Sequence, residues 1–305
     1  MLIAIDHGNS AIKTPDFSFT SALERYPSKP PLSGDYLAYD GYVWALSEDR
    51  IPYKMDKTEN ENFFVLTLFA IAKHMAKNGS IPSYMDIDLA VGLPPEHFIM
   101  LRAPFSEYFK RSSIRFLYND TPTCISINRV FVYPQAYAAV VPQGTQLVQV
   151  PRIFIIDIGG YTTDVLLLKK GAADMKFCRS FEFGVIKMCN QIIGKINAKH
   201  GMKLEEDQVI SAIRNDPNTI LQPQVQTMIR QEAGIYAAKL VDVLRENEVE
   251  LKANPAIFIG GGSVLFRPYI EQSPLIAKAD FILNTRANAV GYAMLAAAQM
   301  KKTSA

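Results

Sequence analysis

The feature that most constrains the fold is a strand-and-turn pattern that occurs twice, about half a chain apart. Residues 3–13 and residues 154–165 each contain a short β-branched run, then an aspartate, one further residue and a glycine. A run of Ile and Val predicts a buried strand. The aspartates Asp6 and Asp157 therefore stand at strand ends, and each glycine allows the following backbone N–H groups to face an anion. The duplication predicts two related domains.

A carboxylate beside such a turn suits a magnesium–nucleotide complex, because Mg²⁺ prefers oxygen ligands. A single Asp-x-Gly after a strand fits an ordinary tight turn equally well. A third strand within residues 256–266 runs into Gly260, Gly261 and Gly262, and we expect Ser263 to begin a helix. Three strand-to-glycine turns in this order favour a nucleotide site over three unrelated turns.

Composition and charge argue against several other classes of function. The chain of 305 residues has a formal net charge of +2 and no basic stripe, so we expect no direct binding of nucleic acid. The longest apolar run, from Phe63 to Ala72, is far shorter than the ~20 residues that a spanning helix needs. A first strand that begins at Leu2 leaves no room for a signal peptide, and the three cysteines show no disulfide or metal spacing. These features predict a cytoplasmic protein that does not bind membranes.

Strands and helices alternate along the chain, which is typical of an α/β protein. Residues 14–60 are rich in Pro, Ser, Tyr and Asp and read as a small β-rich insertion outside the core, with a hairpin turn at Asp40-Gly41. We predict the following further elements: helices at 59–77, 95–110, 134–139 and 288–295, strands at 87–91, 114–118 and 126–132, and a mostly helical insertion at 185–231. The last helix is expected to pack on the helix that contains Gln135.

These motifs resemble the nucleotide site of the actin, heat-shock chaperone and sugar kinase superfamily. The chain is most similar to bacterial actin-like plasmid-segregation proteins, the ParM and StbA group. The similarity covers nearly the whole chain and rests on these segments: Asp6 to Asn9 with Lys13; Val91 to Pro94; Asp157 to Gly160 with Thr162, Thr163 and Asp164; and Ala287 to Tyr292.

The resemblance implies an actin-like fold, with two related α/β domains around a nucleotide cleft and a small inserted subdomain in each. Domain I would comprise residues 1–142 with its insertion at about 14–60. Domain II would comprise residues 143–287 with its insertion at about 185–231. Residues 288–305 would form a C-terminal helix that returns to domain I.

Site roles follow from this resemblance and from the chemistry of the side chains. Asp6 and Asp157 would hold Mg²⁺, mainly through its water shell, and Asp164 would orient a metal-bound water or bond a neighbouring backbone amide. Lys13 would neutralise phosphate charge, or it faces solvent on the next strand. The expected contacts with phosphates and nucleoside are Gly8, Asn9, Ser10, Gly159, Gly160, Tyr161, Thr162, Thr163, Gly184, Gly260, Gly261 and Gly262, with Gly184 near the ribose.

Gln135 departs from the ParM pattern, in which this position commonly holds glutamate, and matches actin instead. A neutral amide is no strong base, but it can orient the attacking water, which is the main requirement of in-line phosphoryl transfer. We therefore expect slow hydrolysis that involves Gln135, Asp6 and Asp157. The plainer interpretation is that Gln135 only packs or caps its helix. His7, by contrast, is expected to be a packing residue.

The function that these expectations favour is a filament-forming ATPase that uses ATP, with GTP as an alternative, and Mg²⁺. Such filaments would segregate plasmid or other DNA through an adaptor protein bound to a centromere-like site. A second hypothesis is a non-polymerising phosphotransferase or reactivating ATPase of the same superfamily. A third is a nucleotide-binding scaffold without turnover. Nucleotide-dependent sedimentation distinguishes the first from the other two.

Overall fold

The computed structural model describes residues 1–30 and 34–303. The chain divides into two compact units: unit 1 comprises Met1–Pro142 and Arg286–Ala305, and unit 2 comprises Gln143–Thr285. Residues 31–33 of the predicted insertion and residues 304–305 of the predicted C-terminal segment lie outside the described residues. In the described part of the chain, no helix combines the length and the apolarity needed to cross a membrane.

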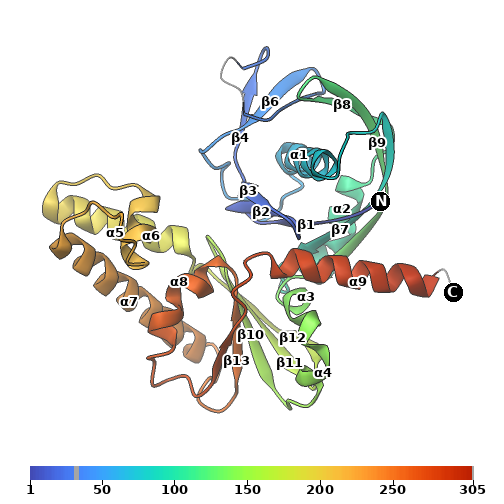
Figure 1. The fold of residues 1–305 in the computed structure, drawn as a ribbon. Helices are drawn as coiled ribbons and strands as arrows, with labels where there is room; N and C mark the ends of the chain where they lie inside the picture. The colour runs from blue at the N-terminus through green and yellow to red at the C-terminus, as the bar shows by residue number, and fades with distance from the viewer. Residues whose placement is uncertain (31–33, 304–305) are drawn as a thin grey trace. The chain divides into compact units, whose positions relative to one another are not determined.

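Unit 1 is built on one large mixed sheet (Figure 1). Its strands are β1 (Leu2–His7), β2 (Ala11–Lys13), β3 (Ser18–Thr20), β4 (Leu23–Tyr26), β5 (Tyr36–Tyr39), β6 (Tyr42–Leu46), β7 (Tyr84–Leu93), β8 (Ile114–Tyr118) and β9 (Thr121–Pro134). Across the described residues these nine strands follow the order β3-β2-β1-β7-β9-β8-β5-β6-β4. Because β1, β7 and β9 are adjacent and parallel, their carboxyl ends share one edge of the sheet.

Helix α1 (Asn62–Lys77) runs inside this curled sheet (Figure 1). Residues 63–72 are buried all round the helix, because strands surround it, and this explains why the apolar run has no polar face. The helix ends where predicted but begins at Asn62 rather than at residue 59. The side chain of Asn60 accepts a hydrogen bond from the Asn62 N–H (3.0 Å), which holds residue 60 in a turn outside the helix.

The predicted hairpin is confirmed, but its place in the fold differs from the expectation. β5 and β6 pair around Asp40 and Gly41, whose φ angles of 52° and 77° suit a tight two-residue turn. However, β5 also pairs with β8, with Leu37 opposite Tyr118, and Leu37 is fully buried. The interpretation of residues 14–60 as lying outside the core is therefore wrong for β5. No local sequence pattern indicates this pairing, because the partner strand β8 is distant in the chain.

The helices that flank the sheet differ in length from the prediction. α2 spans Phe98–Phe109, within the predicted 95–110. α3 spans only Tyr137–Val140, followed by a 3₁₀ turn at Val141–Gln143, because β9 continues to Pro134 through the predicted start of that helix. Gln135 therefore lies in the turn between β9 and α3 and not on a helix.

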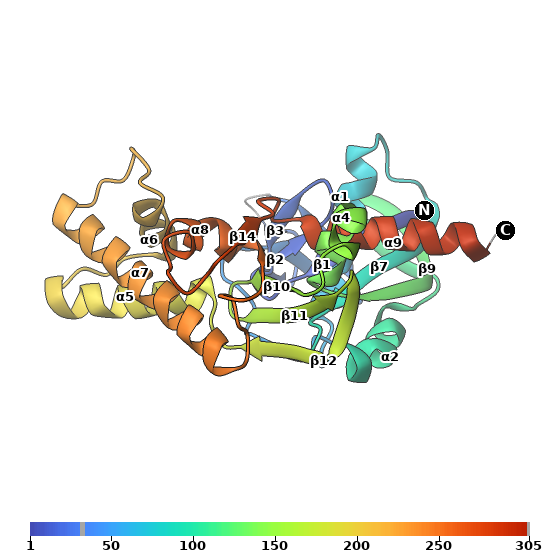
Figure 2. The same ribbon diagram turned by 90° about the horizontal axis from the view of Figure 1, so that it is seen from below.

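The C-terminal helix α9 (Ala287–Thr303) extends beyond the predicted segment 288–295, as expected for a helix over 288–305, and lies along β1 and β7 (Figure 2). It also packs on α3, as predicted. A Cβ atom at Gly291 would come within 1.8 Å of the Ala138 carbonyl oxygen, so a glycine is required for this close approach.

Unit 2 contains a second sheet. Its strands are β10 (Ile153–Ile158), β11 (Thr163–Lys169), β12 (Ala172–Phe181), β13 (Ala256–Ile259) and β14 (Ala279–Phe281). Among the described residues these five strands follow the order β12-β11-β10-β13-β14. β10 and β13 are parallel, so Asp157 and Gly260 come at neighbouring strand ends.

Helices of unit 2 account for the segment predicted as a helical insertion. The helices of this unit are α4 (Gly144–Val148), α5 (Val185–His200), α6 (Glu206–Ile213), α7 (Pro223–Glu246) and α8 (Gly261–Ile270), and of these α5, α6 and the first part of α7 lie in the predicted insertion at 185–231. α5, α6 and α7 pack on one another and share a core with the sheet (Figures 1 and 2). α7 continues past the predicted limit at residue 231, and α8 begins at Gly261 rather than at Ser263.

Candidate functional site

Three predicted site residues meet at the carboxyl edge of the sheet of unit 1. Asp6 is buried near the end of β1, and the pairing of β1 with β2 places it opposite Lys13. The Lys13 Nζ lies 3.8 Å from the Asp6 Oδ2, and the Gln135 Nε2 donates a hydrogen bond of 2.8 Å to the Asp6 Oδ1. Lys13 therefore faces a carboxylate and does not only face solvent.

The orientation of the Gln135 amide follows from its partner. An ionised carboxylate can only accept hydrogen bonds, so the NH₂ end of the amide must face Asp6. The Oε1 atom is consequently the end of Gln135 that can accept a hydrogen bond from a water molecule. This arrangement gives Gln135 a chemical capacity beyond helix packing.

Hydrogen bonds within unit 1 hold the turn after β1. The Gly8 N–H donates to the Ala11 carbonyl (3.1 Å), and the Ser21 N–H donates to the Ser10 carbonyl (3.2 Å). The Asn9 side chain donates to the Lys54 carbonyl and accepts from the Lys54 N–H, at 3.0 Å each. The Asn9 amide thus anchors the turn, and the sequence pattern contained no signal for this partner.

His7 is a packing residue, as predicted. Its ring stacks on Phe109 at a centroid distance of 4.8 Å, and its Nε2 lies 2.8 Å from the Thr67 Oγ1. Complete burial, with a smaller effect of the Lys57 charge, lowers the pKa of His7 to about 3. The imidazole is therefore neutral at physiological pH.

In unit 2, two carboxylates face each other across neighbouring strands. Asp157 on β10 pairs directly with Asp164 on β11, and both are buried. The Thr162 Oγ1 lies 3.3 Å from the Asp164 Oδ2. Like charges directly opposite each other are unfavourable unless a cation or hydrogen-bond donors compensate them. The pair therefore suits a site for a hydrated divalent cation.

The glycine turn after β10 is joined to the start of α5. The Val185 and Ile186 N–H groups donate to the carbonyls of Gly159 (3.1 Å) and Gly160 (2.8 Å). A Cβ at Gly184 would lie 2.3 Å from the Gly160 carbonyl oxygen, so only glycine fits there. Gly184 therefore sets the position of the turn against α5.

Thr163 is predicted to contact the nucleotide, but its side chain bonds within unit 2. It is fully buried, and its hydroxyl donates to the Phe183 carbonyl. It therefore ties β11 to the segment before α5. Thr162, by contrast, has its hydroxyl beside Asp164 in the same turn.

The third glycine turn lies against the end of β10. Gly260 has a φ of +86°, and a Cβ there would lie 2.4 Å from the Asp157 Oδ1. A Cβ at Gly262 would lie 2.3 Å from Ile158 Cγ2, whereas one at Gly261 would meet nothing within 4 Å. Two of these glycines are thus required by close packing, and the third leaves space beside the backbone.

The residues present fit a magnesium–nucleotide complex in which the protein supplies only part of the metal's coordination. In residues 1–30 and 34–303, no three His, Cys, Asp or Glu side chains gather as a metal site. Mg²⁺ binds readily through one or two carboxylates with water and phosphate oxygens as its other ligands. Each unit holds buried carboxylates of this kind: Asp6 in unit 1, and the Asp157–Asp164 pair in unit 2.

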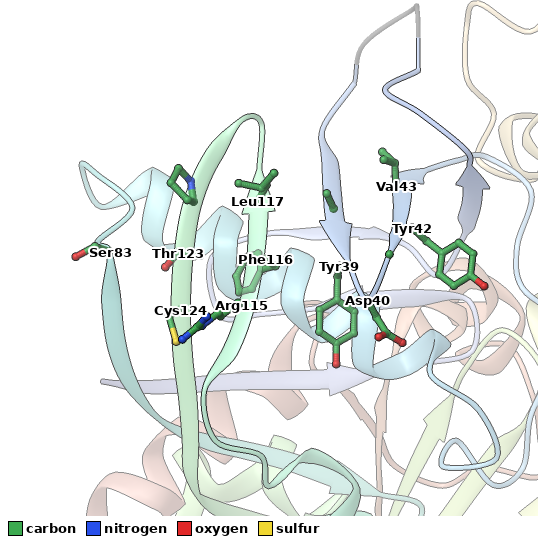
Figure 3. Close-up of a pocket in the computed structure, with 13 residues that line it drawn as sticks. Tyr39, Asp40, Tyr42, Val43, Ser83, Arg115, Phe116, Leu117, Thr123 and Cys124 are labelled. Carbon is green, nitrogen blue, oxygen red and sulfur yellow. The ribbon is translucent and has the colours of Figure 1, made fainter.

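A pocket of about 570 Å³ lies elsewhere in unit 1, at the β5–β6 and β8–β9 hairpins (Figure 3). Its walls include Tyr39, Tyr42, Arg115, Leu117 and Cys124. None of the predicted site residues lines it. The strand-end residues are therefore separate from this pocket.

Family models match both halves of the chain. The model for the N-terminal domain of actin-like proteins matches residues 42–137. The model for the C-terminal part of the archaeal MreB-like actin homologue matches residues 155–272. No curated protein sequence matches the chain.

Solved structures of actin-like proteins share the fold at low sequence identity. The archaeal actin homologue Ta0583 in complex with ADP has a TM-score of 0.75 and 19% identity, over 97% of this chain and 99% of that chain. Apo pSK41 ParM has a TM-score of 0.70 and 14% identity, over 100% and 99%.

A ParM from Clostridium botulinum, solved as a 15-stranded filament, has a TM-score of 0.74 and 16% identity, over 97% and 99%. The fold, the order of the strand-end turns and the two family models agree. The chain therefore has the actin-like fold, which it shares with ParM, and models of actin-like domains match a part of each half.

Proposed function

We propose that the protein is a filament-forming ATPase that binds Mg²⁺–ATP at its strand-end turns. The observation that carries the proposal is that each unit ends a central strand in a buried aspartate followed by a glycine turn. ADP bound to one similar protein and filaments formed by another support nucleotide binding and self-association.

The site residues of this chain would have the following roles in ATP binding and hydrolysis. Asp6 and Asp157 would hold the metal through water, with Asp164 orienting one of those waters. Lys13 and the backbone of the glycine turns would offset phosphate charge. Bound Mg²⁺ would supply charge neutralisation, and Gln135 would orient the attacking water through its Oε1 atom.

DNA segregation is the finer part of the proposal. ParM is among the structurally similar proteins, so we propose that the filaments move DNA. With a net charge of only +2, the contact with DNA would be indirect, through an adaptor on a centromere-like site.

Sedimentation tests the proposal directly. The protein is centrifuged with Mg²⁺ and ATP, GTP, ADP, a non-hydrolysable ATP analogue or no nucleotide. We expect pelleting that requires a triphosphate, persists with the analogue and decays as ATP is consumed. Asp157→Ala should abolish Mg²⁺-dependent hydrolysis, whereas Asp174→Ala, at an aspartate on β12 paired with Lys169, should not.

Other outcomes of this experiment would contradict the proposal. Turnover of ATP with protein in the supernatant of every sample would favour a phosphotransferase or reactivating ATPase. Nucleotide binding without turnover would favour a scaffold. Normal hydrolysis by Asp157→Ala would show that the assignment of the site is wrong.

A further inference from the structure

The turn that carries Gln135 has a strained backbone. Ala136 has φ +62° and ψ −54°, a region that L-residues rarely adopt. The Tyr137 N–H donates to the Gln135 carbonyl at 2.6 Å, which closes a γ-turn of the rarer, strained form. Such a conformation persists only where surrounding contacts hold it, and it is concentrated at functional sites.

Contacts from two other elements of unit 1 hold this turn. The Gln135 N–H donates to the Leu93 carbonyl (2.8 Å), which extends the pairing of β9 with β7 by one residue. The Ala136 N–H donates to the Asn288 Oδ1 at 3.0 Å, and this bond is buried. Asn288 stands in the first turn of α9, and Gly291 lets that helix lie against the Ala138 carbonyl.

The geometry of the turn determines where the Gln135 side chain points. β9 leaves the sheet at Pro134, and the sharp turn at Ala136 follows at once, while the Gln135 Nε2 reaches the Asp6 Oδ1. Without the Asn288 oxygen, the Ala136 N–H would lose its acceptor in a buried site, which is unfavourable. The turn would then relax toward negative φ, and the Gln135 side chain would move.

We propose that Asn288 is a positioning residue for hydrolysis: it holds the strained Ala136 turn so that Gln135 keeps its amide on Asp6. This inference rests on the proposed function, because it concerns the residue that would orient the attacking water. It assigns to the C-terminal helix a part in the site.

Three variants test the inference. Asn288→Ala removes the acceptor. Asn288→Ala with Ala136→Gly removes the acceptor and also the strain, since glycine accepts positive φ. Gln299→Ala is the matched control, because it removes a different hydrogen bond between α9 and β9, from the Tyr133 hydroxyl to Gln299 (2.8 Å).

Two readouts are compared in full-length protein. ATP hydrolysis should show a kcat lowered about 10- to 100-fold in Asn288→Ala, since small misplacements of a positioning group cost this much. The KM should change by less than about threefold, which separates positioning from substrate binding. The double variant should recover most of the lost kcat, and Gln299→Ala should retain the wild-type value.

The second readout does not depend on activity. In protein with ¹⁵N-labelled glutamine, the side-chain NH₂ signals of Gln135, identified by their loss in Gln135→Ala, should shift in Asn288→Ala. They should return toward the wild-type position in the double variant and stay unchanged in Gln299→Ala. If the wild type hydrolyses no ATP, the proposed function fails, but these signals still decide the role of Asn288.

Several results would overturn the inference. Unchanged Gln135 signals in a folded Asn288→Ala protein would show that Asn288 does not position this side chain. Signals that shift but do not return in the double variant would show that the Ala136 turn is not the link. If Asn288→Ala does not fold, the double variant must fold with wild-type Gln135 signals for the inference to stand.

Discussion

Asp6 and His7 are neighbours in β1, yet their side chains meet opposite environments. Successive side chains of a strand point to opposite faces. Asp6 therefore meets Lys13 and Gln135 at the sheet edge, while His7 enters the aromatic core and contacts Thr67 on α1. The sequence predicted different roles for the two residues, but only the fold identified their partners.

The burial of His7 predicts a pH dependence of stability. Its folded pKa of about 3 lies below the usual 6.5, so between these values the unfolded chain binds more protons than the folded one. The free energy of unfolding should therefore fall as pH falls from about 6.5 toward 3, by at most about 1.4 kcal/mol per pH unit from this group. Above pH 6.5 this contribution to stability is fully present.

Denaturant unfolding followed by fluorescence measures this effect, because the single tryptophan, Trp44, reports on unit 1. His7→Phe keeps an aromatic ring against Phe109 and should remove this part of the slope. His97→Gln, at a half-buried histidine before α2, is the matched control and should keep it. Equal slopes in His7→Phe and the wild type would refute the prediction.

At the level of elements, each glycine turn is held in place by contacts with a neighbouring segment. The turn after β10 accepts the first N–H groups of α5 and packs on Gly184, so turn and helix form one rigid piece. In unit 1 the Asn9 amide similarly fastens the turn after β1 to the backbone of Lys54. Rigid turns of this kind would keep backbone donors in place for an anion.

Two glycines, Gly184 directly before α5 and Gly194 within it, provide a matched test of this junction. Gly184→Ala would place a Cβ 2.3 Å from a backbone oxygen that cannot move alone, whereas Gly194→Ala places one in open space. We expect Gly184→Ala to destabilise unit 2 by about 1–3 kcal/mol and to weaken nucleotide binding at least about tenfold. Gly194→Ala should stabilise the helix by about 0.5–1 kcal/mol and leave binding unchanged.

Thermal unfolding and nucleotide titration of both variants measure these effects. The comparison isolates the junction, because both substitutions add the same methyl group to the same segment. Wild-type nucleotide affinity in a folded Gly184→Ala protein would show that the turn does not depend on α5.

At the scale of the whole molecule, the two units have separate sheets and separate hydrophobic cores. Each holds a strand-end aspartate, Asp6 in unit 1 and Asp157 in unit 2. If one nucleotide binds to both sets, its binding energy stabilises both units together. If each unit binds independently, a substitution in one should not affect the other.

Thermodynamic linkage distinguishes these cases. Mg²⁺–ATP at 100 times its Kd should raise the free energy of unfolding by about 2.7 kcal/mol. Trp44 fluorescence follows unit 1, and hydrogen exchange of α7 follows unit 2. If one nucleotide binds to both sets, Asp157→Ala in unit 2 should abolish the effect of ATP on unit 1, and Asp174→Ala should preserve it. Stabilisation of unit 1 by ATP in the Asp157→Ala protein would indicate independent sites.

The sequence by itself determined the features that depend on neighbours in the chain. These are the strand-to-glycine turns, the Asp40-Gly41 hairpin, the helix predicted at 59–77 and the α/β class, because turn chemistry and periodicity act locally. The order of these turns along the chain also indicates the actin-like fold, because that order is typical of the fold.

Only the tertiary structure decided the contacts between distant segments. The positive φ of Ala136 has no local signature, because the Asn288 side chain, 152 residues away, holds it. The pairing of β5 with β8 and the place of α1 inside the curled sheet likewise depend on strands far apart in sequence. Local propensity does not predict such contacts, because they stabilise the protein only when the packed core brings the partners together.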